Sequence, residues 1–118
     1  MSDVPAKPPI SIEKSGQAVI VRPQSRIMDE NEIRSLAQVI DQAAVSDAGV
    51  SLVVLDLSLV QMLPSLGLGA LVQISNKCRA RQQKFKLAAV QPSVRQVFSI
   101  TKLDRVFDMA ASVESAMS

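Results

Sequence analysis

The chain has 118 residues and a formal net charge of +2, and its 47% hydrophobic and 20% charged residues are typical of one soluble globular domain. It contains no His, which excludes an imidazole base, a Ser-His-Asp triad and a His-ligated zinc ion, and its single Cys excludes an internal disulfide. Its three Phe are too few to stack the bases of single-stranded nucleic acid, so we expect no direct nucleic-acid partner.

The N-terminal part of the chain predicts a tail followed by a hairpin. Residues 1–9 hold three prolines and few apolar side chains, which is typical of a flexible tail. From Ile10 onward apolar and polar residues alternate around a turn at Ser15-Gly16. The second strand of this predicted hairpin, Ala18–Arg22, ends at Pro23, because proline has no N–H to donate to a sheet.

The next stretch predicts a helix and then a buried strand. Asp29 and the two Glu residues that follow suit a helix start, with Asp29 as the N-cap. Apolar residues then recur at spacings of three and four up to Ala44, and the helix is expected to end at Asp47-Ala48-Gly49. The stretch Leu52–Leu57 is apolar on both faces, which predicts a strand at the centre of a sheet.

Five further elements are expected in the second half of the chain. They are a helix over residues 66–82, a strand over 85–90, a short helix from Pro92, a strand over 106–108 and a short helix from Ser112. The residues predicted to face inward from the helix over 66–82 and from the helix that starts at Pro92 are Leu68, Leu71, Val72, Ser75, Cys78, Val94, Val97 and Phe98. This alternation predicts an α/β domain with a mixed sheet of four or five strands and about four helices packed largely on one face.

The charges are unevenly distributed along the chain. Residues 1–59 carry a net charge of −3 and residues 60–118 a net charge of +5. Five basic residues with no acid between them lie around the end of the helix over 66–82: Lys77, Arg79, Arg81, Lys84 and Lys86. Cations are favoured at a helix C-terminus, so a solvated helix end is the simpler interpretation. The alternative is that these residues steer docking to an acidic partner surface.

No segment resembles a targeting signal or a membrane span. The N-terminus lacks the apolar stretch of a secretory signal, and the longest apolar runs fall well short of the roughly 20 residues that a spanning helix needs. We therefore expect a cytoplasmic protein that inserts into no membrane and uses no metal or cofactor. Cys78 is expected to be reduced and to pack as a small apolar residue.

The segment that suggests a function lies between the central strand and the following helix. It reads Leu63-Pro64-Ser65-Leu66-Gly67-Leu68-Gly69, and Ser65 lies at or next to the N-cap position. Free N–H groups at a helix start favour an anion, and glycines permit a close approach. Two simpler roles remain open: Ser65 as a helix cap, and the glycines as contacts between helix and sheet. The Lys that a P-loop needs is missing, and no base lies beside Ser65 to make it a nucleophile.

This segment, with the strand before it and the helix after it, resembles the STAS domain, and in particular the bacterial anti-sigma factor antagonists. Their signature reads Asp-Ser-Ser-Gly-Leu-Gly, and its first Ser, which is the phosphorylated one, falls on Ser65. The stretch from Pro92 to Phe107 also resembles the third helix and final strand of the family. The resemblance covers residues 10–117, so we expect a STAS-like domain over 10–118. The sequence departs from the signature at Pro64, which replaces Asp, and at Leu66, which replaces the second Ser.

The resemblance implies a regulator and not an enzyme. Such antagonists bind an anti-sigma factor that is itself a serine kinase, thereby release a sigma factor, and dissociate when their serine is phosphorylated. Carried over to this chain, the phosphorylated residue is Ser65 and the partner-binding residues are Leu63, Pro64, Ser65, Leu66, Gly67, Leu68 and Gly69. The leucines would offer apolar contact and the glycines would admit the partner backbone.

Two other functions are kept beside this one. The first is an accessory STAS subunit of a transporter, for example a phospholipid ABC transporter, which would act without phosphorylation and suits the loss of Asp at position 64. The second is a hydrolase that uses Ser65, which the absence of His disfavours.

Overall fold

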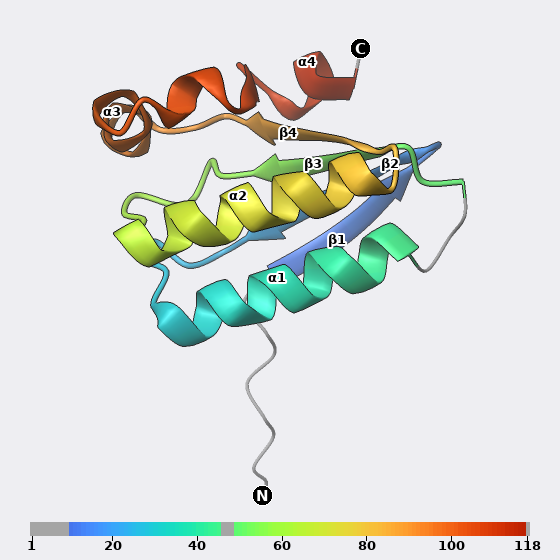
Figure 1. Ribbon diagram of the computed structural model, residues 1–118, viewed down its shortest axis with the longest axis horizontal. Coiled ribbons are helices and arrows are strands. Elements are labelled where there is room, and N and C mark those ends of the chain that lie inside the picture. Colours follow the sequence, from blue (N-terminus) through green and yellow to red (C-terminus); the bar gives the residue numbers. More distant parts are fainter. Residues whose placement is uncertain (1–9, 46–48, 118) are drawn as a thin grey trace, which may run out of the picture.

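The computed structural model describes residues 10–45 and 49–117. Five strands form one sheet in chain order: β1 (Ile10–Ser15), β2 (Ala18–Pro23), β3 (Leu52–Asp56), β4 (Lys84–Ala88) and β5 (Asp108–Ala110). β1 pairs antiparallel with β2, and all other neighbours are parallel, so β3 is the central strand of a mixed sheet (Figure 1). The predicted hairpin, central strand and mixed sheet are confirmed. The predicted tail over residues 1–9, together with residues 47 and 48 of the predicted helix end, lies outside the described residues.

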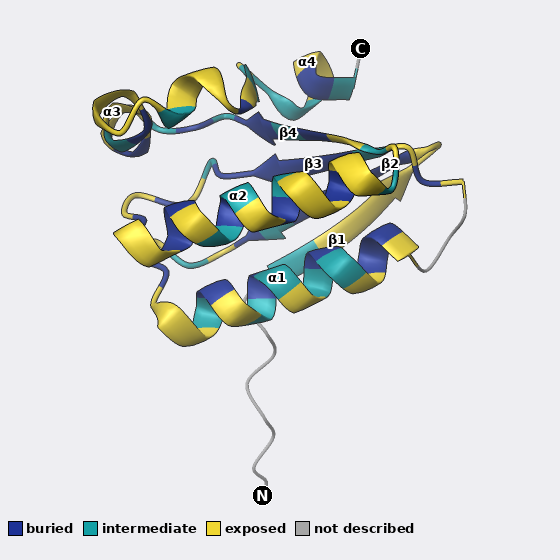
Figure 2. Ribbon diagram, in the orientation of Figure 1, coloured by how far each residue is buried: buried dark blue, intermediate teal, exposed yellow. Residues whose placement is uncertain are grey.

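Three helices cover one face of the sheet and a short fourth helix covers part of the other. α1 (Glu30–Val45), α2 (Ser65–Ala80) and α3 (Pro92–Ile100) pack on alternate strand residues such as Val53 and Leu55. Val54, which points to the opposite face, packs instead with Ala116 of α4 (Val113–Met117). Figure 2 shows the buried sides of α1 and α2 turned toward the sheet and their outer sides exposed. The predicted arrangement, with helices largely on one face, is confirmed.

α1 begins as its sequence predicts. The carboxylate of Asp29 accepts a hydrogen bond from the Glu32 N–H at 2.8 Å, and the Glu32 carboxylate accepts one from the Asp29 N–H at 3.3 Å. This reciprocal pair is a capping box, and the hydroxyl of Ser25 also donates to Glu32. The N-cap assigned to Asp29 is therefore confirmed.

Several details of the second half differ from the prediction. α2 ends at Ala80 and β4 at Ala88, each two residues before the predicted end, because Gln82 and Ala89 adopt positive φ angles of 62° and 55° that continue neither a helix nor a strand. Val97 of α3, predicted to face inward, is half-buried.

The buried residues of α2 include Ile74, whereas Val72 and Ser75 are only half-buried, because the inward stripe continues from Leu71 through Ile74. β5 begins at Asp108, two residues after the predicted start, because a short 3-10 helix, η1 (Leu103–Arg105), precedes it. Phe107 still enters the core, where its ring packs edge-on against Phe85 and Phe98.

Candidate functional site

The site lies where the connection between β3 and α2 crosses the carboxyl ends of the parallel strands, next to the first turn of α1 (Figure 1). Two neighbouring segments fix this connection. The loop before α1 contributes the Arg26 carbonyl, which accepts hydrogen bonds from the N–H groups of Gln61 and Met62 at 2.7 and 3.1 Å. The start of α3 contributes the Ser93 hydroxyl, which donates to the Gln61 carbonyl at 2.9 Å, and the Gln91 amide, which donates to the Ser58 carbonyl. The backbone before α2 is therefore held from both sides.

Asp56, the last residue of β3, anchors the beginning of the same connection. Its carboxylate is buried, accepts a hydrogen bond from the Arg22 guanidinium at 2.6 Å and accepts another from the Ser58 N–H at 2.9 Å. Burial alone would raise the pKa of Asp56, but the hydrogen bonds from Arg22 and Ser58 outweigh it and hold the pKa below its usual value. Asp56 therefore stays charged and holds the beginning of the connection in place.

α2 begins without a side-chain cap. Pro64 occupies the N-cap position with φ −72° and ψ 165°, and its carbonyl accepts a hydrogen bond from the Gly67 N–H at 2.8 Å. Ser65 is the first helical residue and is exposed, and its hydroxyl has no hydrogen bond to any residue in the described ranges. The interpretation of Ser65 as only a helix cap therefore has no hydrogen bond to support it, and the hydroxyl is free for other chemistry.

The leucines and glycines of the segment separate into inward and outward groups. Leu63 and Leu68 are both 5% exposed and belong to the core, so they do not present the apolar contact predicted for them. A Cβ on Gly67 would lie 2.8 Å from Leu63 Cδ1 and 3.1 Å from Ile33 Cδ1, so this glycine allows internal packing and not the approach of a partner. Gly69 is exposed and a Cβ there would meet nothing within 4 Å. Only the outward residues of the segment remain available to a partner.

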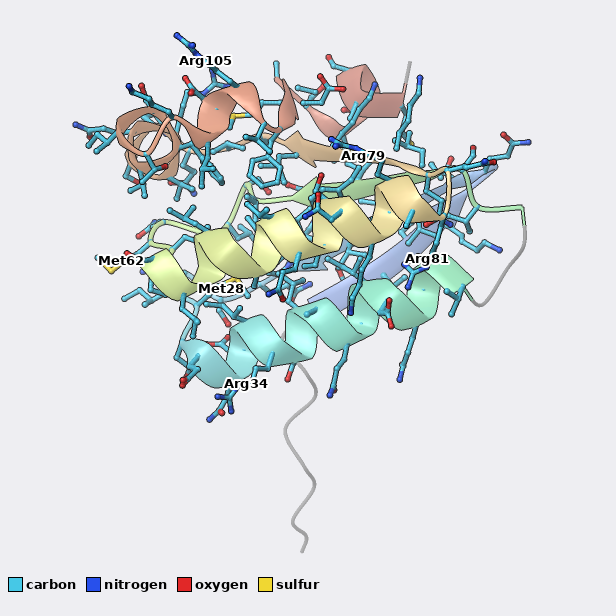
Figure 3. All side chains as sticks on the ribbon, viewed as in Figure 1. Met28, Arg34, Met62, Arg79, Arg81 and Arg105 are labelled. Atoms are coloured by element: carbon cyan, nitrogen blue, oxygen red, sulfur yellow. The ribbon has the colours of Figure 1, made fainter. Side chains whose placement is uncertain are left out.

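Three exposed apolar side chains lie on the connection that leads into α2, on the first turn of α2 and on the loop that pairs with the connection. Leu66 is 53% exposed, Met62 58% and Ile27 60%, and the backbones of Ile27 and Met62 pair in an isolated parallel bridge. We name Ser65 and these three residues the Ser65 surface. Figure 3 shows Met62 pointing away from the body of the protein at the start of α2. The sequence did not reveal Ile27 or Met62 as site residues, because only the fold brings the loop before α1 beside the start of α2.

A groove of about 500 Å³ adjoins the Ser65 surface. It runs between α1 and α2, and Ser65, Leu66 and Gly69 line its α2 side. Glu30 and Arg34 line its α1 side, where they form an exposed ion pair at 3.4 Å. Because these two charges offset each other, the groove presents no strong net charge to a partner.

Within the described residues, no helix is both long and apolar enough to cross a membrane. The same ranges contain no group of three or more His, Cys, Asp or Glu side chains that could hold a metal ion.

Comparison with known proteins identifies the fold. The family model of the STAS domain matches residues 9–116. BtrV of Bordetella bronchiseptica, described as a candidate anti-sigma factor antagonist, is 35% identical over 74 residues, which are 63% of this chain and 64% of BtrV, so the match spans less than two thirds of that relative. An anti-sigma factor antagonist from Mycobacterium paratuberculosis is 27% identical, with a TM-score of 0.77 over 92% of this chain and 89% of that one.

SpoIIAA of Bacillus, an anti-sigma factor antagonist known in unphosphorylated and phosphorylated forms, shares the fold. Its unphosphorylated structure matches with a TM-score of 0.77 and 20% identity, and the match covers 92% of each chain. These relatives are named as anti-sigma factor antagonists, which agrees with the prediction of a regulator from the sequence. The chain belongs to the STAS domain family and resembles its anti-sigma factor antagonists.

Proposed function

We propose that this protein is an anti-sigma factor antagonist that binds an anti-sigma serine kinase through the Ser65 surface and is released when Ser65 is phosphorylated. One observation carries the proposal: an exposed serine hydroxyl, without a hydrogen bond in the described part of the chain, lies at the start of α2 beside the exposed Leu66 and three residues after the exposed Met62. The resemblance to BtrV and to the mycobacterial antagonist supports this class of partner. The two forms of SpoIIAA support a switch by phosphorylation.

The apolar residues of the Ser65 surface supply the attraction. Single exposed apolar side chains are ordinary, but several in one place mark a surface that binds another molecule. Full burial of such a side chain contributes about 1.5–3 kcal/mol, and roughly half of each of the three remains to be buried. Covering Ile27, Met62 and Leu66 would therefore contribute about 2–4 kcal/mol to binding.

A phosphate on Ser65 would act on the complex more than on the fold. It adds nearly two negative charges at a helix N-terminus, where the helix dipole favours an anion by about 0.3–1 kcal/mol. The first turn of α2 contains no acidic residue that would repel it. Enclosing the same charge in an apolar interface costs several kcal/mol, which exceeds the gain from the dipole. Phosphorylation is therefore expected to dissociate the partner while the domain stays folded.

The experiment is affinity capture from native lysate with the wild-type protein and three variants, followed by mass spectrometry of the bound proteins. We expect the wild type and Ser65→Ala to retain an anti-sigma factor with an ATP-binding kinase domain. Ser65→Asp should reduce the captured amount at least about tenfold. Ser99→Asp adds the same charge at an exposed serine of α3, so it is the matched control and should capture as the wild type does.

Incubation of the isolated complex with ATP then tests the switch directly. The proposed function requires a phosphopeptide that contains Ser65 and the loss of the partner as it forms. Equal capture by Ser65→Asp and the wild type would refute the switch. Recovery of a transporter ATPase in place of a kinase would refute the antagonist function and support the transporter alternative.

A further inference from the structure

A second groove lies on the side of α2 that faces away from α1. It has a volume of about 390 Å³ and is lined by basic residues from three separate elements: Arg79 of α2, Lys84 of β4 and Arg105 of η1. We name it the cationic groove. Figure 3 shows Arg79 and Arg105 on this side of α2 and Arg34 on the far side of α1. The groove is therefore distinct from the Ser65 surface and from the groove between α1 and α2.

The structure divides the basic run of the sequence into two groups. Arg81 forms an ion pair with Asp41 of α1, and the hydrogen bond from Arg81 together with the nearby charge of Lys77 lowers the pKa of Asp41. Arg81 and Lys77 thus help to hold the two helices together. Arg79, in contrast, is exposed, and it has no ion pair with a residue in 10–45 or 49–117.

Lys84 and Arg105 share both properties of Arg79. Both are exposed and neither forms an ion pair within the described ranges. One carboxylate, that of Asp108, lines the cationic groove against these three cations, which leaves an excess of positive charge. Exposed cations that form no internal ion pair are available to a ligand.

Three apolar residues also line the cationic groove. The rings of Phe85 and Phe107 pack edge-on with their centroids 6.3 Å apart, and Val106 beside them is 45% exposed. Phe85 and Phe107 are 8% and 6% exposed, so neither offers a free ring face on which a nucleic-acid base could stack. Three cations beside the exposed Val106 fit a segment that carries both carboxylates and an apolar side chain.

We propose that the cationic groove docks an acidic segment of a partner protein. The guanidinium groups of Arg79 and Arg105 would receive carboxylates in paired hydrogen bonds, and an apolar side chain between those carboxylates would cover Val106. Docking of this kind raises the rate of association and weakens as salt screens the charges. The proposal does not rest on the proposed function, because it requires neither Ser65 nor an anti-sigma factor.

Fluorescence anisotropy with a labelled peptide, Glu-Glu-Leu-Glu-Glu, tests the proposal at low and at physiological ionic strength. We expect the wild type to bind this peptide and not its Gln-Gln-Leu-Gln-Gln counterpart. Arg79→Glu/Arg105→Glu should weaken binding at least about tenfold, and Arg79→Gln/Arg105→Gln should give a smaller loss. Arg34→Glu reverses one charge on α1, which is half the charge change of the double variant, and should stay within about twofold of the wild type. Ser65→Asp should bind as the wild type does.

Four outcomes would overturn the proposal. They are no binding of the acidic peptide at low salt, equal binding of the uncharged peptide, an equal loss in Arg34→Glu, and displacement by inorganic phosphate as readily as by unlabelled peptide. The third would indicate an effect of net charge alone, and the fourth a site for small anions. Circular dichroism confirms that each variant is folded, which we expect because the replaced arginines are exposed.

Discussion

The first turns of α1 and α2 lie at the same end of the molecule, yet they are completed in opposite ways (Figure 1). α1 has a capping box between Asp29 and Glu32, extended by Ser25, so its first turn is satisfied by its own side chains. α2 has Pro64 at its N-cap position, no side-chain cap hydrogen bond and an exposed Ser65 whose hydroxyl is unused by any described residue. One helix start stabilises the fold, whereas the other remains open to solvent.

The difference shows that the start of α1 stabilises the fold, whereas the start of α2 is left available for recognition. A cap such as that of α1 contributes about 1 kcal/mol, and α2 does without it. The start of α2 is instead held from outside, by Asp56 and by the hydrogen bonds to Gln61 and Ser58. A phosphate on Ser65 would therefore displace no hydrogen bond that the side chain of Ser65 makes to a described residue.

The largest effect is expected when Asp56, which holds the connection before α2, is replaced. Asp56→Ala leaves the Arg22 guanidinium and the Ser58 N–H without their acceptor, which should lower the free energy of unfolding by about 2–3 kcal/mol. Asp104→Ala removes an exposed carboxylate of η1 and should change that free energy by less than about 0.5 kcal/mol. Urea unfolding measures both. Equal stability of the two variants would show that Asp56 does not support the site.

The pH dependence of the unfolding free energy tests the contribution of Asp56 in a second way. The folded protein holds the pKa of Asp56 below that of the unfolded chain, which is near 3.9. The stabilising contribution is therefore fully present above about pH 4 and is lost as the pH falls through the lower folded pKa. Asp56→Asn does not titrate, so the stability difference between it and the wild type should shrink in acid. Urea unfolding curves of the two proteins that shift in parallel below pH 4 would contradict this assignment.

The two glycines at the start of α2 give the next largest contrast. Gly67→Ala places a methyl group 2.8 Å from Leu63 Cδ1, and such overpacking costs about 1–3 kcal/mol, which is offset in part by the gain of about 0.5–1 kcal/mol from replacing a helical glycine. The net loss of unfolding free energy should be about 0.5–2 kcal/mol. Gly69→Ala meets nothing within 4 Å and replaces a helical glycine, so it should stabilise the domain by about 0.5–1 kcal/mol. Thermal unfolding followed by circular dichroism distinguishes the two. A stable Gly67→Ala would mean that the start of α2 adjusts its position freely.

The sequence was sufficient for the order of the elements, because their apolar periodicities and turn residues act locally. It correctly placed the N-cap at Asp29 and the buried strand around Val54. Its periodicity placed Leu68 on the inward face of the helix, although the family resemblance assigned Leu68 to the partner. It did not separate Leu63 from Leu66, because the side of a helix start that faces the core depends on the angle at which the chain enters the helix. That angle is set here by contacts from the loop before α1 and from α3, which are distant in sequence.

The sequence likewise did not reveal which basic residues form internal ion pairs. The basic run was visible in the sequence, but the pairing of Arg81 with Asp41 and the meeting of Arg79 with Arg105 in one groove are products of the tertiary fold. A local pattern shows that cations are concentrated. Which of these cations form internal ion pairs depends on the residues that lie near them in the folded protein.

The smallest expected effects test the comparison of the two helix starts most directly. Asp29→Ala removes the acceptor of the Glu32 N–H and should lower the free energy of unfolding by about 1 kcal/mol. Ser65→Ala removes a hydroxyl that no described residue uses, so its unfolding free energy should stay within about 0.5 kcal/mol of the wild type. Urea unfolding at neutral pH resolves this difference when both variants are measured together. A loss of about 1 kcal/mol in Ser65→Ala would mean that Ser65 caps α2 after all, and a phosphate there would then disturb the fold as well as the interface.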